Sequence, residues 1–211
     1  MRVLDRRAGV GGELVLRVVG EHFEVIANGV FLMDTRNGES ERLLISAAAS
    51  RMPMGGRMLV GGLGVGFSLR AAVDDPRVGS VVVVEREPAV IAWNQGPLRA
   101  VHGDALADPS VTVVEADLVS WLSSCAESFD ALCLDIDNGP EWTVSEGNAA
   151  LYGDSGLTML RARLRPGGVL AVWSANASAS FESRLRAAFA SVSMLPVPVP
   201  RGEPDVVYLA T

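Results

Sequence analysis

The sequence contains no lysine, and all 18 of its basic residues are arginine. Schiff-base catalysis and the phosphate-binding lysine of a P-loop are therefore excluded, because both need a lysine amine. Histidine is nearly as scarce: His22 and His102 are the only two in the chain. Two histidines are too few for a histidine-based metal site, so we expect no bound metal.

Cysteine and long apolar runs are also in short supply. Cys125 and Cys133 lack partners at metal-ligand spacing and lie in or beside apolar runs, so we expect buried thiols. No apolar run approaches the roughly 18 residues of a membrane span. The charged N-terminal stretch Met1–Arg7 lacks the apolar core of a secretory signal. We expect a cytoplasmic protein with no membrane partner.

The charge balance is acidic, with a formal net charge of −7. An acidic surface repels phosphate backbones, so we expect no nucleic-acid partner, whereas a cationic substrate is compatible with it. Of the 211 residues, 49% are hydrophobic, which is enough to bury a sizeable core. The length suits one α/β domain with a small appendage.

Two regions differ in pattern, residues 1–50 and residues 51–211. The first contains short β-rich runs separated by turn residues, and Asn28-Gly29 is a strong hairpin signal. We expect a small antiparallel N-terminal sheet there, followed by an alanine-rich helix. The β-rich runs cover 13–19, 23–27 and 30–33, and the helix is expected over 42–51.

Strands and helices alternate from residue 51 onward. Strands are expected at 58–61, 81–85, 111–115, 129–135, 169–173, 192–199 and 206–209, and helices at 67–73, 88–94, 117–124, 155–164 and 179–190. Such alternation predicts a Rossmann-like α/β fold, with a mostly parallel sheet covered by helices on both faces. In such sheets the ligand lies at the carboxyl ends of the strands, where polar residues should converge.

A glycine-rich loop follows the first strand of this region. Gly61, Gly62, Gly64 and Gly66 fall within six positions, where the chain must reverse and let a ligand lie against bare backbone. The next strand ends at Glu85, about twenty residues later, as in nucleotide-binding βαβ units. The G-x-G-x-x-G fingerprint of nicotinamide-binding proteins, if it started at Gly62, would need glycine or alanine at position 67, where this sequence has phenylalanine. The alternative to a cofactor-binding loop is a purely structural turn between strand and helix.

The order of motifs resembles a known family. After the loop and Glu85 come Ala116-Asp117, Asp135 at a strand end, and Arg165-Pro-Gly-Gly168 before another strand. This order resembles the class I S-adenosylmethionine-dependent methyltransferases and, among them, the spermidine synthases (polyamine aminopropyltransferases). The resemblance implies a seven-stranded sheet, a transferase using S-adenosylmethionine or its decarboxylated form, and a small amine acceptor. It also implies a homodimer, because relatives pair through their N-terminal regions.

Each candidate site residue has a functional reading beside a structural one. The two oxygens of Glu85 suit a ribose diol, and Asp117 either accepts from the adenine amino group or caps a helix. Asp135 and Asp137 are the candidate catalytic carboxylates, able to hold an amine and accept its proton, although Asp137 also suits a turn. The expected cofactor-binding set is Gly61, Gly62, Gly64, Gly66, Glu85, Arg86, Ala116, Asp117 and Asp135. The expected substrate-binding set is Asn138, Trp142 and Tyr152, whose aromatic faces suit a cationic amine or plain packing.

Three departures from the aminopropyltransferase pattern leave the reaction open. Gly64 stands where the family's loop has an aspartate, which is understood to hold the propylamine ammonium of the donor. Asn138 replaces the second aspartate of Asp-x-x-Asp-Pro, and residues 39–44 lack the family's Tyr-His-Glu. Intact S-adenosylmethionine then becomes more acceptable as the donor. The alternatives are methyl transfer to a substrate that is not a polyamine and a non-catalytic nucleoside-binding scaffold.

Overall fold

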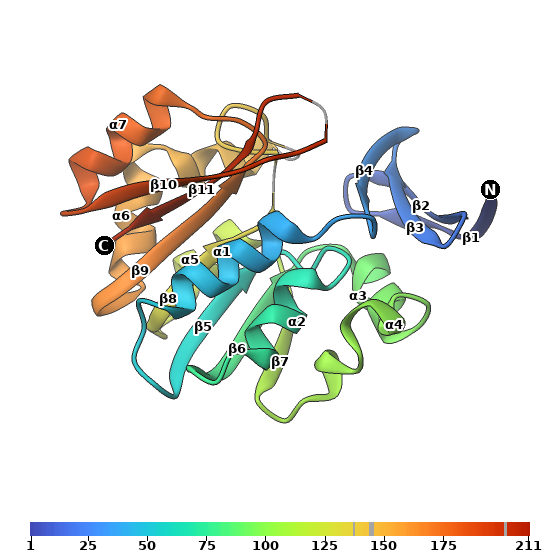
Figure 1. Cartoon of the computed structure of the whole chain (residues 1–211), viewed down its shortest axis with the longest axis horizontal. Helices are drawn as coiled ribbons and strands as arrows, with labels where there is room; N and C mark the ends of the chain where they lie inside the picture. Colours follow the sequence, from blue (N-terminus) through green and yellow to red (C-terminus); the bar gives the residue numbers. More distant parts are fainter. Residues whose placement is uncertain (137, 144–145, 201) are drawn as a thin grey trace.

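The computed structural model describes residues 1–136, 138–143, 146–200 and 202–211. It contains a four-stranded antiparallel sheet and a seven-stranded, mostly parallel sheet (Figure 1). The smaller sheet lies beside one end of the larger one, close to helix α3 (Pro88–Gln95). The predicted α/β class and the small N-terminal antiparallel sheet are both confirmed.

The small sheet consists of β1 (Arg2–Gly9), β2 (Gly12–Val19), β3 (His22–Ala27) and β4 (Val30–Asp34), paired in chain order. Asn28 and Gly29 take the left-handed conformation, with φ of 50° and 81°, and form the predicted tight turn. Strand β1 was not expected from the sequence, because arginines and an aspartate interrupt its apolar alternation. It is tied to α3, whose Trp93 Nε1 donates to Asp5 Oδ2 at 2.9 Å.

The large sheet has the order β10-β11-β9-β8-β5-β6-β7. Its central strands pair in parallel, and β11 runs antiparallel to both β9 and β10. The strands are β5 (Gly56–Gly61), β6 (Val78–Glu85), β7 (Val111–Glu115), β8 (Phe129–Leu134), β9 (Leu164–Ser174), β10 (Val192–Val197) and β11 (Asp205–Ala210).

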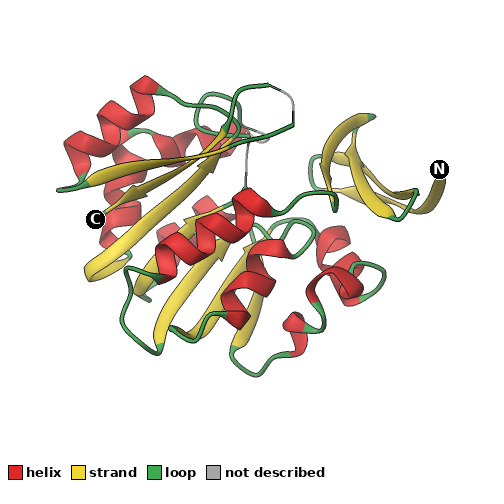
Figure 2. Cartoon of the chain, viewed as in Figure 1, coloured by secondary structure: helices red, strands yellow, loops and turns green. Residues whose placement is uncertain are grey.

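Helices cover both faces of this sheet (Figure 2). Successive residues of β5 point to opposite faces, so Met58 and Val60 join one buried cluster while Leu59 joins the other. A strand buried on both faces is apolar throughout, which explains its unbroken hydrophobic run. The other helices are α1 (Glu39–Ala49), α2 (Phe67–Asp74), α4 (Arg99–His102), α5 (Leu118–Ser124), α6 (Asp154–Ala162) and α7 (Ala179–Ala188). Among the described residues, we find no helix with the length and apolar character needed to cross a bilayer.

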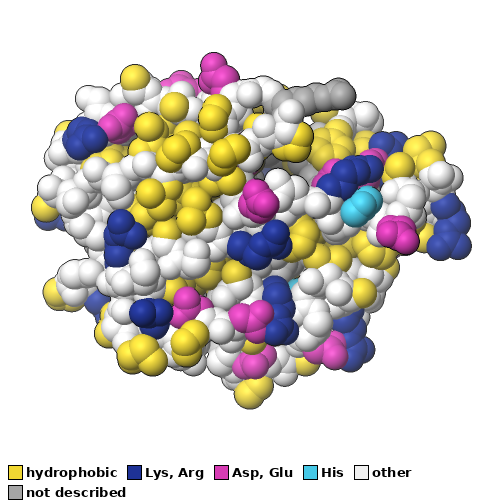
Figure 3. All heavy atoms as spheres, in the orientation of Figure 1, with side chains coloured by type: hydrophobic (Ala, Val, Ile, Leu, Met, Phe, Trp, Pro, Cys, Tyr) yellow, Lys and Arg dark blue, Asp and Glu magenta, His cyan; other side chains and the backbone are white. Residues whose placement is uncertain are grey.

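The strand order reverses next to β5, which pairs with β6 on one side and β8 on the other. Gly61 at its end lies level with Val84 and Leu134. The carboxyl ends of the three strands therefore meet at one point, which is where ligands bind in open α/β sheets. Arginine and acidic side chains are interspersed over the face shown in Figure 3, without a field of single sign there.

Candidate active site

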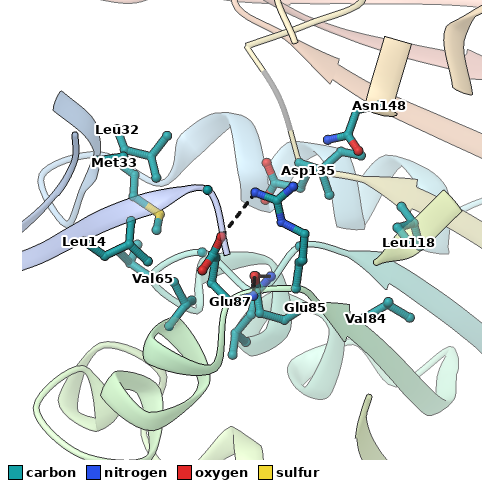
Figure 4. A pocket seen from close by; sticks show the side chains of 18 of the residues that line it. Leu14, Leu32, Met33, Val65, Val84, Glu85, Glu87, Leu118, Asp135 and Asn148 are labelled. Carbon is teal, nitrogen blue, oxygen red and sulfur yellow. Dashed lines mark hydrogen bonds and ion pairs between the residues drawn. The ribbon is translucent and has the colours of Figure 1, made fainter. Parts of the chain in front are cut away.

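A pocket of about 270 Å³ opens at this reversal, between the two sheets. One wall is apolar and includes Leu14, Leu32 and Met33 from the small sheet and Val65 from the glycine loop. Figure 4 shows these four side chains on one side, with the carboxylates of Glu85, Glu87 and Asp135 nearer the centre. The pocket is thus partly apolar and partly acidic, a lining that suits a ligand with both an aromatic base and a cationic end.

The glycine loop connects β5 to α2 and forms part of the pocket wall. Gly62 has a φ of 91°, and a Cβ there would collide with the carbonyl oxygen of Asp135. Gly64 also takes a positive φ, of 53°. Of the four predicted glycines, Gly62 and Gly64 line the pocket. Gly61 and Gly66 are not among the lining residues, and a Cβ at Gly61 would lie 2.6 Å from Cδ2 of the lining residue Leu118.

Glu85 at the end of β6 holds this loop in place. Its Oε2 accepts from the Leu63 backbone N–H at 2.9 Å, and its Oε1 accepts from the Glu87 N–H at 2.8 Å. Burial raises the pKa of the Glu85 carboxyl above its ordinary value. A carboxylate oxygen can accept more than one hydrogen bond, so both oxygens keep capacity for a ribose diol. The loop-holding contact was not foreseen from the sequence.

Ala116 and Asp117 follow β7 and line the same pocket. Asp117 is the N-cap of α5: its Oδ1 accepts from the Ser120 N–H at 2.9 Å and from the Ser120 hydroxyl at 2.8 Å. The structural reading of Asp117 is therefore confirmed. Both contacts use one oxygen, which leaves the other to accept from a bound base.

Asp135 follows β8 and lies against the glycine loop. Its Oδ2 accepts from the buried Ser68 hydroxyl at 2.7 Å, and its N–H donates to Gly61 O at 2.9 Å. Burial raises the pKa of Asp135 to about 6, and the charge of Glu85 adds to the shift. A raised pKa in a pocket is typical of an acid–base group.

Glu41 in α1 is a pocket residue that the sequence did not identify. Burial raises the pKa of Glu41 to about 7, and the neighbouring charge of Asp135 contributes. Two carboxylates that are 94 positions apart in the sequence thus share one pocket. Trp173 also lines the pocket, and its Nε1 donates to Asp205 Oδ2 at 3.3 Å. The sequence signal that could have identified Glu41 was its position within residues 39–44, the segment where aminopropyltransferases carry Tyr-His-Glu.

The predicted substrate-binding residues divide into two groups. Asn138 lines the pocket, together with Asn148, which the sequence analysis did not single out. Trp142 is 68% exposed, and Tyr152 is buried in the core, its ring edge-on to Phe181 with centroids 5.6 Å apart. The structure does not place these two aromatic rings at the pocket, because one faces solvent and the other packs against α7. Asp137 lies outside the described residues.

Arg86 and Glu87 form the edge of the pocket next to the small sheet. The Arg86 guanidinium lies 3.2 Å from Glu87 Oε1, the ion pair drawn in Figure 4. Glu87 Oε2 accepts from the Val10 N–H at 2.8 Å, so the turn between β1 and β2 is fastened to the start of α3. The N-terminal sheet is thereby held as a wall of the pocket.

No protein-family model matches the sequence. Among curated proteins, the chain is 34% identical over 118 residues to a polyamine aminopropyltransferase of Mycobacterium tuberculosis, covering 54% of this chain and 22% of that protein. It is also 34% identical over 119 residues to polyamine aminopropyltransferase 1 of Streptomyces coelicolor, covering 56% and 22%. The match to the Korarchaeum cryptofilum enzyme of the same name is 31% over 115 residues, covering 54% and 34%.

Two solved structures of spermidine synthases share the fold. One, in complex with the transition-state analogue AdoDATO, has a TM-score of 0.82 at 15% identity and covers 99% of this chain and 73% of its own. The other, from Thermotoga maritima, has a TM-score of 0.78 at 14% identity, with 99% and 72% covered. At 14–15% identity, these two likenesses show a shared fold. The chain matches only about a fifth of the length of the mycobacterial and streptomycete relatives.

Proposed function

We propose that this chain is a transferase that binds S-adenosylmethionine or its decarboxylated form and alkylates a small amine. The observation that carries the proposal is the position of Asp135. Its carboxylate lies beside the glycine loop, at the point where the β5, β6 and β8 ends meet. The similarity to polyamine aminopropyltransferases supports the same chemistry.

The nucleoside part of the donor fits the groups around the loop. Glu85 offers both carboxylate oxygens to the ribose hydroxyls, and Asp117 offers one oxygen to the adenine amino group. Gly62 and Gly64 present backbone without side chains, and Ala116 and Arg86 line the same cavity. These residues bind and orient the donor, and they need not change protonation during the reaction.

The acidic end of the pocket suits the amine. A bound sulfonium donor supplies an electrophilic carbon, which the amine nitrogen must attack in line after losing its proton. The new C–N bond forms as the C–S bond breaks, and the sulfur leaves as a neutral thioether. Asp135 and Glu41 can attract the ammonium, and Asp135 can accept the proton. The protein's main contribution is to place the nitrogen and exclude water. Asp137 and Asn138 stand two and three positions after Asp135 in the sequence, and a role for Asp137 remains a prediction.

The direct test combines calorimetry with mass spectrometry. We expect methylthioadenosine or S-adenosylhomocysteine to bind to the purified chain, and a panel of small amines incubated with each donor to yield one product with the added mass of the transferred group. Failure of both nucleosides to bind would refute the proposal. Binding without any product across the panel would favour the scaffold alternative. Sedimentation equilibrium would test the homodimer that the resemblance implies.

The donor is the point at which methyl transfer and aminopropyl transfer separate. Gly64 has no side chain, so the loop offers no carboxylate at this position. A Cβ added there would lie 3.6 Å from Met33 Sδ, which belongs to the apolar wall of the pocket. We expect intact S-adenosylmethionine to bind at least as tightly as the decarboxylated compound, because no loop acid repels its carboxylate. Calorimetry with the two donors measures the ratio. A strong preference for the decarboxylated donor would exclude this interpretation of Gly64.

The titration of the carboxylate pair predicts how turnover depends on pH. Asp135, with a pKa of about 6, and Glu41, with one of about 7, must be ionised to hold an ammonium. Turnover measured with saturating donor should therefore rise with pH between 6 and 7, because the proton-accepting form becomes populated. A rate that stays constant from pH 5 to 8 would contradict the assigned role.

The stability of the folded protein should fall as the pH rises, whereas turnover should increase. The pKa of Asp135 is raised from its ordinary 3.8, so the folded protein binds this proton more tightly than the unfolded chain does. The stabilising contribution is complete below pH 3.8 and is lost as the pH rises to about 6. An Asp135→Asn variant should lose this part of the pH dependence of the melting temperature.

A further inference from the structure

The glycine loop rests on a buried polar pair on the side away from Glu85. Asn94, at the end of α3, is completely buried, and His102, at the end of α4, is 1% exposed. Asn94 Nδ2 donates to Gly64 O and to Val90 O, each at 2.9 Å. The side-chain amide of Asn94 thus connects the Gly64 carbonyl of the loop to helix α3.

His102 completes this support through a defined tautomer. Its Nε2 lies 3.0 Å from the backbone oxygen of Asn94. A carbonyl oxygen can only accept, so Nε2 carries the hydrogen. Burial lowers the pKa of His102, and the charges of Arg70 and Arg99 lower it further, so the ring is neutral at pH 7. The neutral ring donates from Nε2 and leaves Nδ1 as a bare acceptor.

The pair also fixes the turn that starts α2. Gly66 has a φ of 98°, and a Cβ there would lie 2.8 Å from His102 Cδ2 and 3.0 Å from Asn94 Oδ1. The backbone at Gly66 therefore lies directly on the two side chains. Among the described residues, Asn94 Oδ1 and His102 Nδ1 have no hydrogen-bond partner. Burying unpaired acceptors costs free energy, so packing alone does not account for this polar pair.

We propose that Asn94 and His102 are positioning residues, which hold the Gly64 carbonyl and the Gly66 turn so that the loop presents its backbone to the donor nucleoside. Asn94 grips the loop from the helix side, while Glu85 accepts from Leu63 on the sheet side. Two neighbouring residues of the loop, Leu63 and Gly64, are therefore each held by a side-chain hydrogen bond. Neither Asn94 nor His102 lines the pocket. The inference rests on the proposed nucleoside site.

Hydrogen exchange in the ligand-free protein tests the support directly. Asn94→Leu removes the donor and keeps the number and branching of the side-chain heavy atoms, and Asn94→Ala is a second variant with no excess bulk. We expect the amides of residues 62–66 to exchange at least about tenfold faster in both, while amides of the sheet strands keep their protection. Gln95→Leu is the matched control, because it replaces an amide by an apolar side chain at the next residue of the same helix, where the side chain is exposed. It should leave the loop amides unchanged.

Binding of methylthioadenosine gives the functional readout. Both Asn94 variants should bind it at least about tenfold more weakly, whereas Gln95→Leu should bind as the unmodified protein does, because only the Asn94 variants displace the loop. Loop amides that exchange at the unmodified rate in both Asn94 variants would overturn the inference, as would an increase spread evenly over the sheet. Failure of the unmodified protein to bind the nucleoside would overturn the proposed function instead, and the exchange result would still decide the role of the pair.

Discussion

Asp135→Asn should reduce turnover by about a hundredfold to ten-thousandfold, the range that a positioned proton acceptor contributes. Asparagine keeps the size of the side chain, and its amide oxygen can still accept from the Ser68 hydroxyl. It cannot accept a proton or balance the charge of an ammonium. We therefore expect nucleoside affinity to change little while turnover collapses, which single-turnover rates and calorimetry can separate.

The matched control is Asp108→Asn, the same chemical change at a site outside the pocket lining. Asp108 accepts from the backbone and hydroxyl of Ser110 in a turn before β7, and asparagine supports the same turn. Turnover of this variant should match that of the unmodified protein. An Asp135→Asn variant that keeps most of its activity would show that another group accepts the proton. If neither form turns over any amine while both bind the nucleoside, the scaffold alternative stands.

The alternation of strands and helices was predictable because it depends on local signals. Each central strand is a short apolar run bounded by turn residues, and the loop glycines mark a place where the chain reverses against a neighbouring carbonyl. The convergence of Glu85, Asp117 and Asp135 also follows from the fold class, since parallel strands end at the same edge. These are general rules of α/β sheets, so one sequence was enough.

The rest of the pocket depends on contacts between distant segments. Glu41 reaches it because α1 packs back onto the large sheet, where its Leu44 and Ala48 join the core around β5. Trp173 lines the pocket. Trp142 and Tyr152 do not, although they are nearer to Asp135 in the sequence. Which aromatic ring faces a cavity is set by packing, and no local pattern carries that information.

Supports behind the site were equally hidden. His102 was noted only as one of two histidines, too few for a metal site, and Asn94 carried no motif. Their relation to Gly64 and Gly66 appears only when α3 and α4 are placed under the loop. Similarly, Glu85 was predicted from its spacing as a ribose ligand. Its hydrogen bonds to Leu63 and Glu87 add a second task, holding the loop, which spacing alone does not reveal.

Glu85→Gln should weaken binding of methylthioadenosine by about tenfold to a hundredfold. Hydrogen bonds to a charged group contribute about 1.5–3 kcal/mol, and each 1.4 kcal/mol is a factor of ten in affinity. Glutamine cannot accept at both ends, since its NH₂ group would face either the Leu63 or the Glu87 N–H. The variant therefore loses a ribose acceptor and one fastening of the loop together. Isothermal titration calorimetry at pH 8 measures the change.

The melting temperature distinguishes this loss from general damage. Burial raises the pKa of Glu85, so its ionised form is a cost to the folded protein that the neutral amide avoids. We expect stability to fall far less than affinity does. Glu115→Gln is the matched control, because Glu115 ends β7 directly beside Glu85 in the sheet but is exposed. If the Glu85 and Glu115 variants bind methylthioadenosine with equal affinity, Glu85 is not part of the binding site, because its burial would then be the only difference between the two carboxylates.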